Sequence, residues 1–158
     1  MYFPAFKPLN IYSVPVITLM SIFSSYLFFL FSGIGTVDLQ LNLKPTRNDS
    51  GQVLINIYED ETNFPYHPSQ SIAVPKSKLR DTNFQLPLAL ANGTYAITLL
   101  DDENNNGEMD YNWMGLPKEG FGFSNNVKPG LGGPPSFKDC QFTLGNPGNQ
   151  ITIRWVYF

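Results

Sequence analysis

The feature that most limits how this chain can fold is a long N-terminal stretch without charge. No Asp, Glu, Lys or Arg occurs between Lys7 and Asp38, and most residues of Ile11–Gly35 are apolar. A charged start, an apolar run and small residues at its end form the pattern of an export signal, and about 20 apolar residues can cross a bilayer. Pro15 and the nearly all-round apolarity suit a membrane or an export channel better than a buried core helix. We therefore expect residues 1–35 to be a signal peptide or a signal-anchor helix.

Two outcomes stay open for this leader. Gly33 and Gly35 stand two positions apart, as small residues before a signal-peptidase site do, and this spacing favours cleavage after Gly35. The apolar run is long for a cleaved signal, so an uncleaved transmembrane anchor is the alternative. In both cases we expect an exported domain over residues 36–158 that is periplasmic, extracellular or anchored to the membrane by the N-terminal segment.

The composition indicates one mildly acidic folded domain. The chain has 158 residues, a net charge of −3 and 42% hydrophobic residues, which is enough for a single core. The acidic balance argues against nucleic acid as a partner, because phosphate binding requires a basic surface. The single cysteine excludes an intramolecular disulfide and a zinc site built from several thiolates of one chain.

Short segments with strand character predict that residues 36–158 form an all-β domain. Apolar and polar residues alternate cleanly along Thr36–Leu43, which is typical of a strand with one buried face. The other segments with strand character are Gln52–Tyr58, Ser71–Val74, Phe84–Leu88, Thr94–Leu100, Cys140–Leu144 and Ile151–Trp155. Pro87 favours a sheet edge for its segment, and Asn92-Gly93 favours a hairpin. We expect a β-sandwich of about seven strands.

The acidic residues gather in a loop with the pattern of a calcium site. Five of the thirteen acids lie in Asp101–Asp110, and the run D-x-N-x-N-G extends from Asp102 to Gly107. Oxygen-bearing side chains at alternate positions, followed by a glycine, allow a short loop to wrap a hard cation. The expected ligands are the side chains of Asp102, Asn104, Asn106 and Asp110 and the backbone carbonyl of Glu108.

The loop differs from an EF-hand, because Trp113 occupies its twelfth position and no helices are predicted on either side. With few carboxylates, its affinity for Ca²⁺ should be weak, about 10⁻⁴–10⁻³ M. A plain solvated turn is the alternative, since Asn-Asn-Gly is also a strong turn sequence.

A stretch rich in Gly and Phe, Gly115–Phe137, follows the acidic loop. It contains neither of the glycine patterns that cradle phosphate groups. We expect Phe121 and Phe123 to pin this stretch to the sandwich. The alternative is an aromatic surface for a glycan or peptide, for which exposure of Phe121, Phe123 or Trp113 would be the sign.

No residue pattern indicates a catalytic nucleophile. His67 is the only histidine and lies among prolines, and Ser124 lacks the second flanking glycine of a nucleophile elbow. Cys140 is expected to be a buried, inert thiol on the apolar face of a strand. The remaining enzymatic alternative is a hydrolase that uses the glutamates of this region: Glu103, Glu108 and Glu119. Because the apolar surroundings that raise a carboxyl pKa are missing there, we expect that the protein is not an enzyme.

Several sequence blocks resemble a bacterial protein family. The blocks are GQVLINIYED (Gly51–Asp60), GTYAITLLDDENNNGEMDYNWMGLPKEGFGFSNN (Gly93–Asn126), PPSFKDCQFTL (Pro134–Leu144) and ITIRW (Ile151–Trp155). Together they are similar to the bacterial domain of unknown function 2141, over about Thr36–Tyr157. Asn105 stands where many members carry Gly, which leaves the oxygen pattern of the acidic loop intact.

The resemblance implies a small exported protein with an immunoglobulin-like or transthyretin-like β-sandwich and no assigned activity. It also implies that Asp102–Phe137 is the hallmark of the family. We therefore expect a cell-envelope module that acts by binding or structure and uses no cofactor except, in one alternative, Ca²⁺. Its expected partner is a protein or glycan of the envelope, and its only membrane contact is the N-terminal segment.

Overall fold

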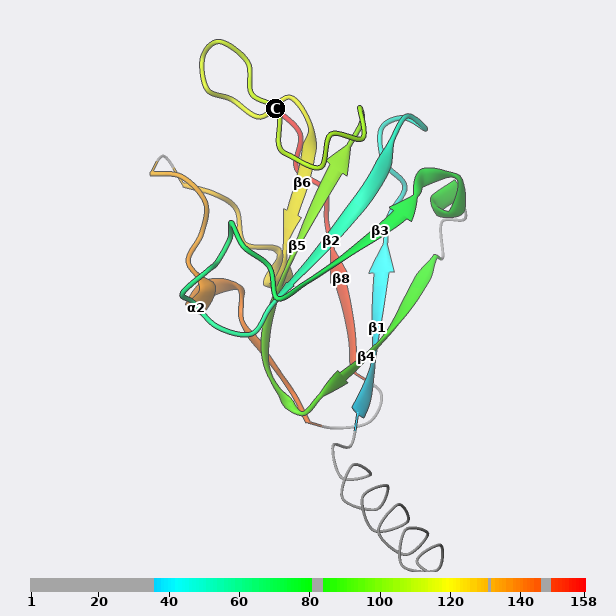
Figure 1. The fold of residues 1–158 in the computed structure, drawn as a ribbon, viewed down its shortest axis with the longest axis vertical. Helices are drawn as coiled ribbons and strands as arrows, with labels where there is room; N and C mark the ends of the chain where they lie inside the picture. Colours follow the sequence, from blue (N-terminus) through cyan, green and yellow to red (C-terminus); the bar gives the residue numbers. More distant parts are fainter. Residues whose placement is uncertain (1–35, 81–83, 131, 146–148) are drawn as a thin grey trace, which may run out of the picture. The chain divides into compact units, whose positions relative to one another are not determined.

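Eight strands in two sheets form the computed structural model, which describes residues 36–80, 84–130, 132–145 and 149–158 (Figure 1). The three-stranded sheet has the order β4-β1-β8, with β1 over Thr36–Leu43, β4 over Gln85–Ala91 and β8 over Asn149–Ile153. The five-stranded sheet has the order β3-β2-β5-β6, and β7 also pairs with β5. Its strands are β2 (Gln52–Tyr58), β3 (Gln70–Pro75), β5 (Gly93–Asp102), β6 (Gly120–Phe123) and β7 (Phe142–Leu144).

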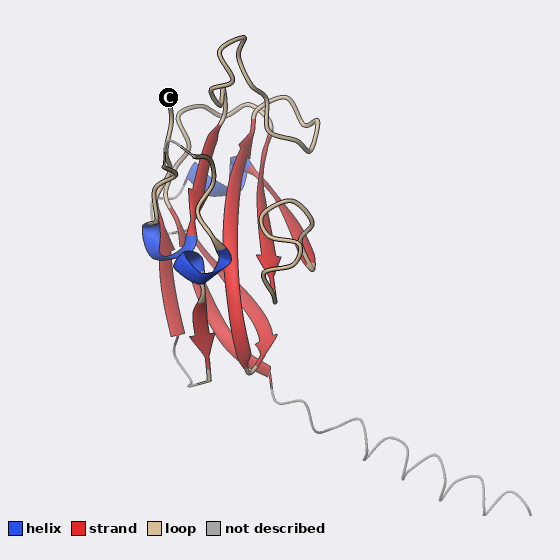
Figure 2. Ribbon diagram, turned by 90° about the vertical axis from the view of Figure 1, so that its left-hand side faces the viewer, coloured by secondary structure: helices blue, strands red, loops and turns tan. Residues whose placement is uncertain are grey.

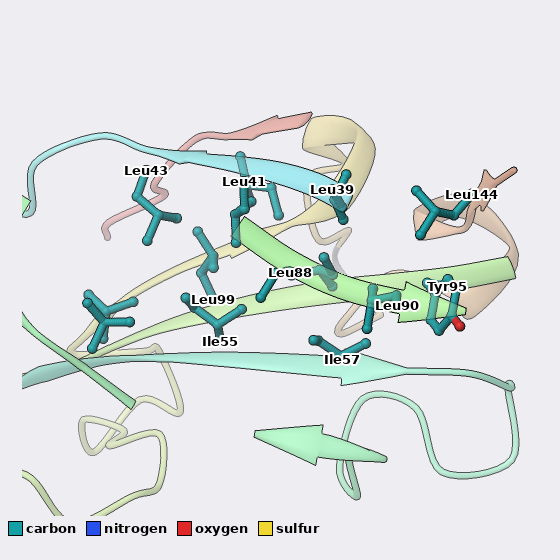
Figure 3. Close-up of a cluster of buried hydrophobic side chains, with 14 of the residues drawn as sticks. Leu39, Leu41, Leu43, Ile55, Ile57, Leu88, Leu90, Tyr95, Leu99 and Leu144 are labelled. Atoms are coloured by element: carbon teal, nitrogen blue, oxygen red, sulfur yellow. The ribbon is translucent and has the colours of Figure 1, made fainter. Parts of the chain in front are cut away.

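The two sheets pack face to face around one main core, as Figure 2 shows from the side. Leu39 and Leu41 of β1 point toward Ile55 and Ile57 of β2, and Leu99 of β5 lies beside them (Figure 3). These five side chains are at most 2% exposed. Successive side chains of a strand point to opposite faces, so the alternation in the sequence delivers every second residue to this core. The prediction of an all-β domain is confirmed.

The predicted leader, residues 1–35, and its predicted cleavage after Gly35 lie outside the described residues. Within the described part of the chain, no helix is long and apolar enough to cross a bilayer.

The predicted hairpin at Asn92-Gly93 is wrong. β4 pairs with β1, whereas β5 pairs with β2, β6 and β7, so the turn carries the chain from one sheet to the other. Leu90 of β4 and Tyr95 of β5 both contribute to the main core, which they reach from the two facing sheets.

The Gly/Phe-rich stretch contains a strand that the sequence did not predict. Gly120–Phe123 forms β6, which pairs with β5 from Thr98 to Asp101. A Cβ on Gly120 would lie 2.2 Å from the Tyr157 ring, and one on Gly122 would lie 2.8 Å from the Arg154 carbonyl. Glycine is therefore required where the C-terminal segment crosses β6.

Phe121 and Phe123 are buried in a second apolar cluster with Ala96 and Cys140. Two of the cluster's partly buried members, Phe64 and Phe137, meet edge to face with a centroid separation of 5.8 Å. The prediction that the phenylalanines pin the stretch to the sandwich is confirmed, because both side chains are at most 8% exposed.

Cys140 is buried as predicted, but the prediction that it lies in a strand is wrong. It ends the short helix α2 (Phe137–Cys140), and β7 begins only at Phe142. The Ser136 side chain accepts a hydrogen bond from the Asp139 N–H, and Asp139 accepts one from the Ser136 N–H, which forms a capping box. This cap starts a helical turn where alternation alone suggested a strand.

Two 3₁₀ helices, η1 (Lys76–Arg80) and η2 (Ser124–Asn126), follow β3 and β6.

Candidate metal site

The predicted calcium loop connects the antiparallel strands β5 and β6 at one end of the sandwich (Figure 1). β5 ends at Asp102, and β6 begins at Gly120. The end of the chain lies at the same end of the sandwich, because the Val156 N–H donates to the Phe121 carbonyl at 2.7 Å. The rigid sheet therefore fixes both ends of the loop.

Asp102 anchors the loop through hydrogen bonds from the backbone. Its Oδ1 accepts the Asn106 N–H at 3.0 Å, and its Oδ2 accepts the Gly107 N–H at 3.1 Å and the Gln52 amide at 2.8 Å. Asn105 and Gly107 have φ values of 60° and 81°, which turn these N–H groups back toward the carboxylate. Asp102 is 0% exposed, and the hydrogen bonds compensate the loss of water around its charge.

Two asparagines converge on the Asp110 carboxylate. The Nδ2 of Asn104 donates to Asp110 at 2.8 Å, and that of Asn106 donates at 3.3 Å. Their Oδ1 atoms accept the backbone N–H groups of Asn106 and Glu108, respectively. A cation beside Asp110 would thus replace the amide N–H groups of Asn104 and Asn106 as partner of the carboxylate. Each of these two side-chain amides would then turn its oxygen toward the cation.

Four of the five predicted ligands therefore lie in one hydrogen-bonded loop: Asp102, Asn104, Asn106 and Asp110. Glu108 has an exposed side chain and joins the same loop through its backbone N–H. Across the residues that the structure describes, no group of three Asp, Glu, His or Cys side chains could hold a metal ion. A cation here would consequently depend on the two asparagines as well as on the two aspartates.

Glu119 closes the loop, a role that the sequence did not predict. It is only 3% exposed, its Oε1 accepts the Glu103 N–H at 2.8 Å and its Oε2 accepts the Asp110 N–H at 3.2 Å. One side chain thereby joins the first and last parts of the acidic segment. No local pattern signals this contact, because the partners come from separate parts of the loop.

The three glutamates of the hydrolase alternative have different surroundings. Glu103 forms an ion pair with Arg47 at 2.6 Å, and this hydrogen bond lowers the pKa of Glu103. Glu108 is exposed, and both carboxylate oxygens of Glu119 are occupied by backbone N–H groups. In this structure Glu103 forms a salt bridge, Glu119 holds two parts of the loop together, and Glu108 faces solvent.

The tip of the long loop carries exposed apolar side chains on a small hairpin. Tyr111 and Pro117 form a β-bridge, the Asn112 N–H donates to the Leu116 carbonyl at 2.9 Å, and the Asn112 side chain accepts the Leu116 N–H at 3.0 Å. Trp113 at this tip is 92% exposed and Met114 is 58% exposed. Of the three rings proposed for ligand binding, Trp113 is therefore the exposed one, while Phe121 and Phe123 are buried.

The remaining candidate nucleophiles have structural contacts or ordinary surroundings. Ser124 is buried, and its hydroxyl donates to the Cys140 carbonyl at 2.6 Å while it accepts the Ile97 N–H at 3.0 Å. Burial raises the pKa of the Cys140 thiol to about 11, which keeps it protonated and unreactive near neutral pH. His67 is exposed on its loop.

Asp101, the neighbour of Asp102, belongs to a separate interior cluster. It forms an ion pair with Lys76 inside the sandwich and accepts a hydrogen bond from the Tyr157 hydroxyl at 2.8 Å. Burial, followed by the hydrogen bond to Asp101, raises the pKa of Tyr157, so the phenol stays a neutral donor. The sequence had placed Asp101 with the loop acids, although the period of two along β5 indicates opposite faces for adjacent residues.

Comparison with known proteins identifies a family of bacterial proteins. The family model DUF2141, described as an uncharacterized protein conserved in bacteria, matches residues 41–152. No curated protein and no solved structure matches the chain.

Proposed function

The chain belongs to the DUF2141 family of uncharacterized proteins conserved in bacteria, and we propose that it is an exported cell-envelope module that acts by binding or structure, not by catalysis. Its partner in this proposal is a protein or glycan of the envelope. The sandwich would be of immunoglobulin-like or transthyretin-like type, as the family resemblance suggests. The distinguishing element is a loop that binds Ca²⁺ between β5 and β6.

Export is supported by the uncharged, apolar sequence before Asp38. Processing after Gly35 would leave a mature chain that begins at Thr36, the first residue of β1. Fractionation of cells that express the full chain, with N-terminal sequencing of the product, tests this part. Recovery of the intact N-terminus in the membrane fraction would favour the anchor, and recovery of all the protein in the cytoplasm would refute export.

The observation that carries the calcium proposal is the convergence of Asn104 and Asn106 on the Asp110 carboxylate. In the proposal, Ca²⁺ replaces the two amide N–H groups as the partner of Asp110, and both asparagines turn their oxygens toward it. Asp102 supplies a second carboxylate that is already positioned by backbone N–H groups, and Glu108 supplies its carbonyl. A hard cation prefers such an oxygen set, and the small number of carboxylates keeps the Kd at about 10⁻⁴–10⁻³ M.

Thermal unfolding of the full chain in Ca²⁺ and in chelator tests the site. A ligand that binds only the folded state stabilises it by about 2.7 kcal/mol at one hundred times Kd, which corresponds to about 10 mM Ca²⁺ for the tighter affinity. The melting temperature should therefore be several degrees higher in Ca²⁺ than in chelator.

Matched variants show whether such a rise comes from this loop. Asp110→Asn and Asp102→Ala should abolish the rise, whereas Glu61→Gln, which changes an exposed carboxylate of another loop, should keep it. Absence of any rise in the parent protein, or an equal rise in Asp110→Asn, would overturn the calcium site.

A second candidate function is the binding of a glycan or peptide at the loop tip, and the exposure of Trp113 favours it. An exposed indole on a hydrogen-bonded hairpin can stack on a ligand with little loss of conformational freedom. Titration of the full chain with envelope glycan fragments, followed by tryptophan fluorescence, tests this function. Binding that survives in Trp113→Ala would refute the assignment to this side chain.

A further inference from the structure

Lys76 and Asp101 meet inside the sandwich, at the end of the main core. Both side chains are 0% exposed. Asp101 pairs in register with Val53, and Val53 in turn pairs with Val74 of β3. Since Val53 and Val74 point into the main core, the alternation of each strand directs Asp101 and Lys76 into the same interior space.

The groups around this pair come from three other places in the chain. The Lys76 Nζ donates to the Asn48 Oδ1 at 3.0 Å, and the Tyr157 hydroxyl donates to the Asp101 Oδ2 at 2.8 Å. The Asp101 Oδ1 has no hydrogen-bond partner apart from its ion pair with the lysine. Arg47 interacts electrostatically with Asp101, and Glu103 with Lys76, and these two further charges pair with each other at the surface.

A charged pair in this place is costly, because both ions lose their water. The desolvation penalty of a buried pair can exceed its Coulombic gain. The lysine side chain and the carboxyl group of Asp101 are the two reactants of amide formation, and their condensation would remove both charges. The fold holds them in contact and keeps water away from them.

We propose that Lys76 and Asp101 condense to an intramolecular amide cross-link. The lysine ammonium group passes one proton to Oδ1, which frees the Nζ lone pair to form a bond to the Asp101 Cγ; a second proton from Nζ then reaches Oδ1, the Cγ–Oδ1 bond breaks, and Oδ1 leaves as water. The Oδ2 becomes the amide oxygen and keeps the hydrogen bond from Tyr157, which also stabilises the negative charge on this atom in the tetrahedral intermediate. The reaction involves no oxidation or reduction and needs no co-reactant.

The cross-link would connect the end of the edge strand β3 to β5 across the intervening strand β2. With one cysteine the chain cannot form an intramolecular disulfide, so an amide would be its only covalent staple of this kind. A constraint between residues 76 and 101 also holds the base of the candidate metal loop, which begins directly after Asp102. The proposal does not depend on calcium binding.

Intact mass spectrometry of the denatured full chain tests the cross-link. The parent protein should be lighter than its sequence requires by one water, and Lys76→Arg should show no deficit, because a guanidinium is a poor nucleophile. Any N-terminal processing is common to both proteins and cancels in their difference. In Tyr157→Phe the condensation should be slower, so that part of the chains retains the full mass at times when the parent is completely linked.

Peptide mapping of the parent protein gives an independent answer if a variant does not fold. Trypsin should fail to cleave after Lys76, and fragmentation should show one branched peptide that joins the segments with Lys76 and Asp101. A parent protein of full mass with two separate peptides would overturn the proposal and leave an ion pair. A deficit of one water that persists in Lys76→Arg would also overturn it, because the water would then have been lost elsewhere.

Discussion

Asp101 and Asp102 are neighbours on β5, yet they belong to two regions with opposite ways of holding a charge. Asp101 points into the sandwich, where Lys76 and Tyr157 reach it from distant parts of the chain. Asp102 points out of the sheet into the loop, where it binds two backbone N–H groups from the residues that follow it. Acids that are adjacent in the sequence can therefore lie in two different environments, because successive side chains of a strand point to opposite faces of the sheet.

The difference decides what each aspartate can do. The interior pair excludes water and contacts only protein groups, so its chemistry is confined to those groups. The loop carboxylate is held by short-range contacts beside exposed residues such as Asn104 and Asn106, so a cation from solvent can reach their side chains. The four predictions below test this contrast, from the largest expected effect to the smallest.

Asp101→Ala should give the largest loss of stability. It removes one partner of the proposed cross-link and leaves the Lys76 ammonium buried without a negative partner, and breaking a buried pair in this way costs about 3–5 kcal/mol. Denaturant unfolding of the full chain measures the loss. The double variant Lys76→Met/Asp101→Leu leaves no unpaired charge and should recover the part of the loss that comes from the buried ammonium. A loss below about 1 kcal/mol in Asp101→Ala would show that the interior pair is not isolated from water.

Gly51→Ala and Gly107→Ala form a matched pair that compares the packed start of the loop, beside Asp102, with its open turn, since both glycines have a φ near 80°. A Cβ on Gly51 would lie 1.9 Å from the Asp102 carbonyl oxygen, whereas nothing lies within 4 Å of one on Gly107. Gly51→Ala combines strain with a clash and should cost about 2–4 kcal/mol, against about 1–2 kcal/mol for Gly107→Ala. Equal losses in urea unfolding would show that the backbone beside Asp102 can shift.

Much of the sandwich could be predicted from the sequence, because its signals are local. The alternation of Leu39 and Leu41 in β1 and of Ile97 and Leu99 in β5 is produced by strand geometry itself and needs no knowledge of the partner strand. β6 was missed because its strand-like alternation consists of glycine and phenylalanine. The glycines are required only where the Tyr157 ring crosses the strand.

The distinction between local contacts and contacts with distant parts of the chain also explains which parts of the candidate site could be predicted. The turn from Asp102 to Gly107 was predictable, since each side-chain oxygen binds an N–H only a few residues further along. The contacts of Gln52 and Glu119 with this loop were not predictable, because these side chains come from another strand or from the far end of the loop. The Lys76 partner of Asp101 was missed for the same reason.

Asp102→Ala in chelator should have an intermediate effect. It removes the charged acceptor of three part-buried hydrogen bonds, from two backbone N–H groups and the Gln52 amide, and should cost about 1–3 kcal/mol. Hydrogen exchange should speed up at Asn106 and Gly107 while the amides of β2 and β5 stay protected, because the damage is confined to the loop. Faster exchange throughout the sheet would contradict the separation of the two regions.

Arg47→Gln should have the smallest effect, and its dependence on pH separates two contributions. Arg47 donates to Glu103 and also to the Lys118 carbonyl, and only the first contact titrates. The hydrogen bond from Arg47 lowers the folded-state pKa of Glu103, so its stabilisation is complete above the ordinary glutamate pKa of about 4.3 and is lost as the pH falls through the folded-state value.

For this exposed pair we expect a titrating contribution of about 0.2–1 kcal/mol. As the pH falls from 7 to 3, the difference in unfolding free energy between the parent protein and Arg47→Gln should therefore shrink by about this contribution. High salt at pH 7 should reduce it as well, because screening weakens a surface pair. In the Glu103→Gln background the same difference should be independent of pH. A pH dependence that persists there would show that Arg47 acts on another carboxylate.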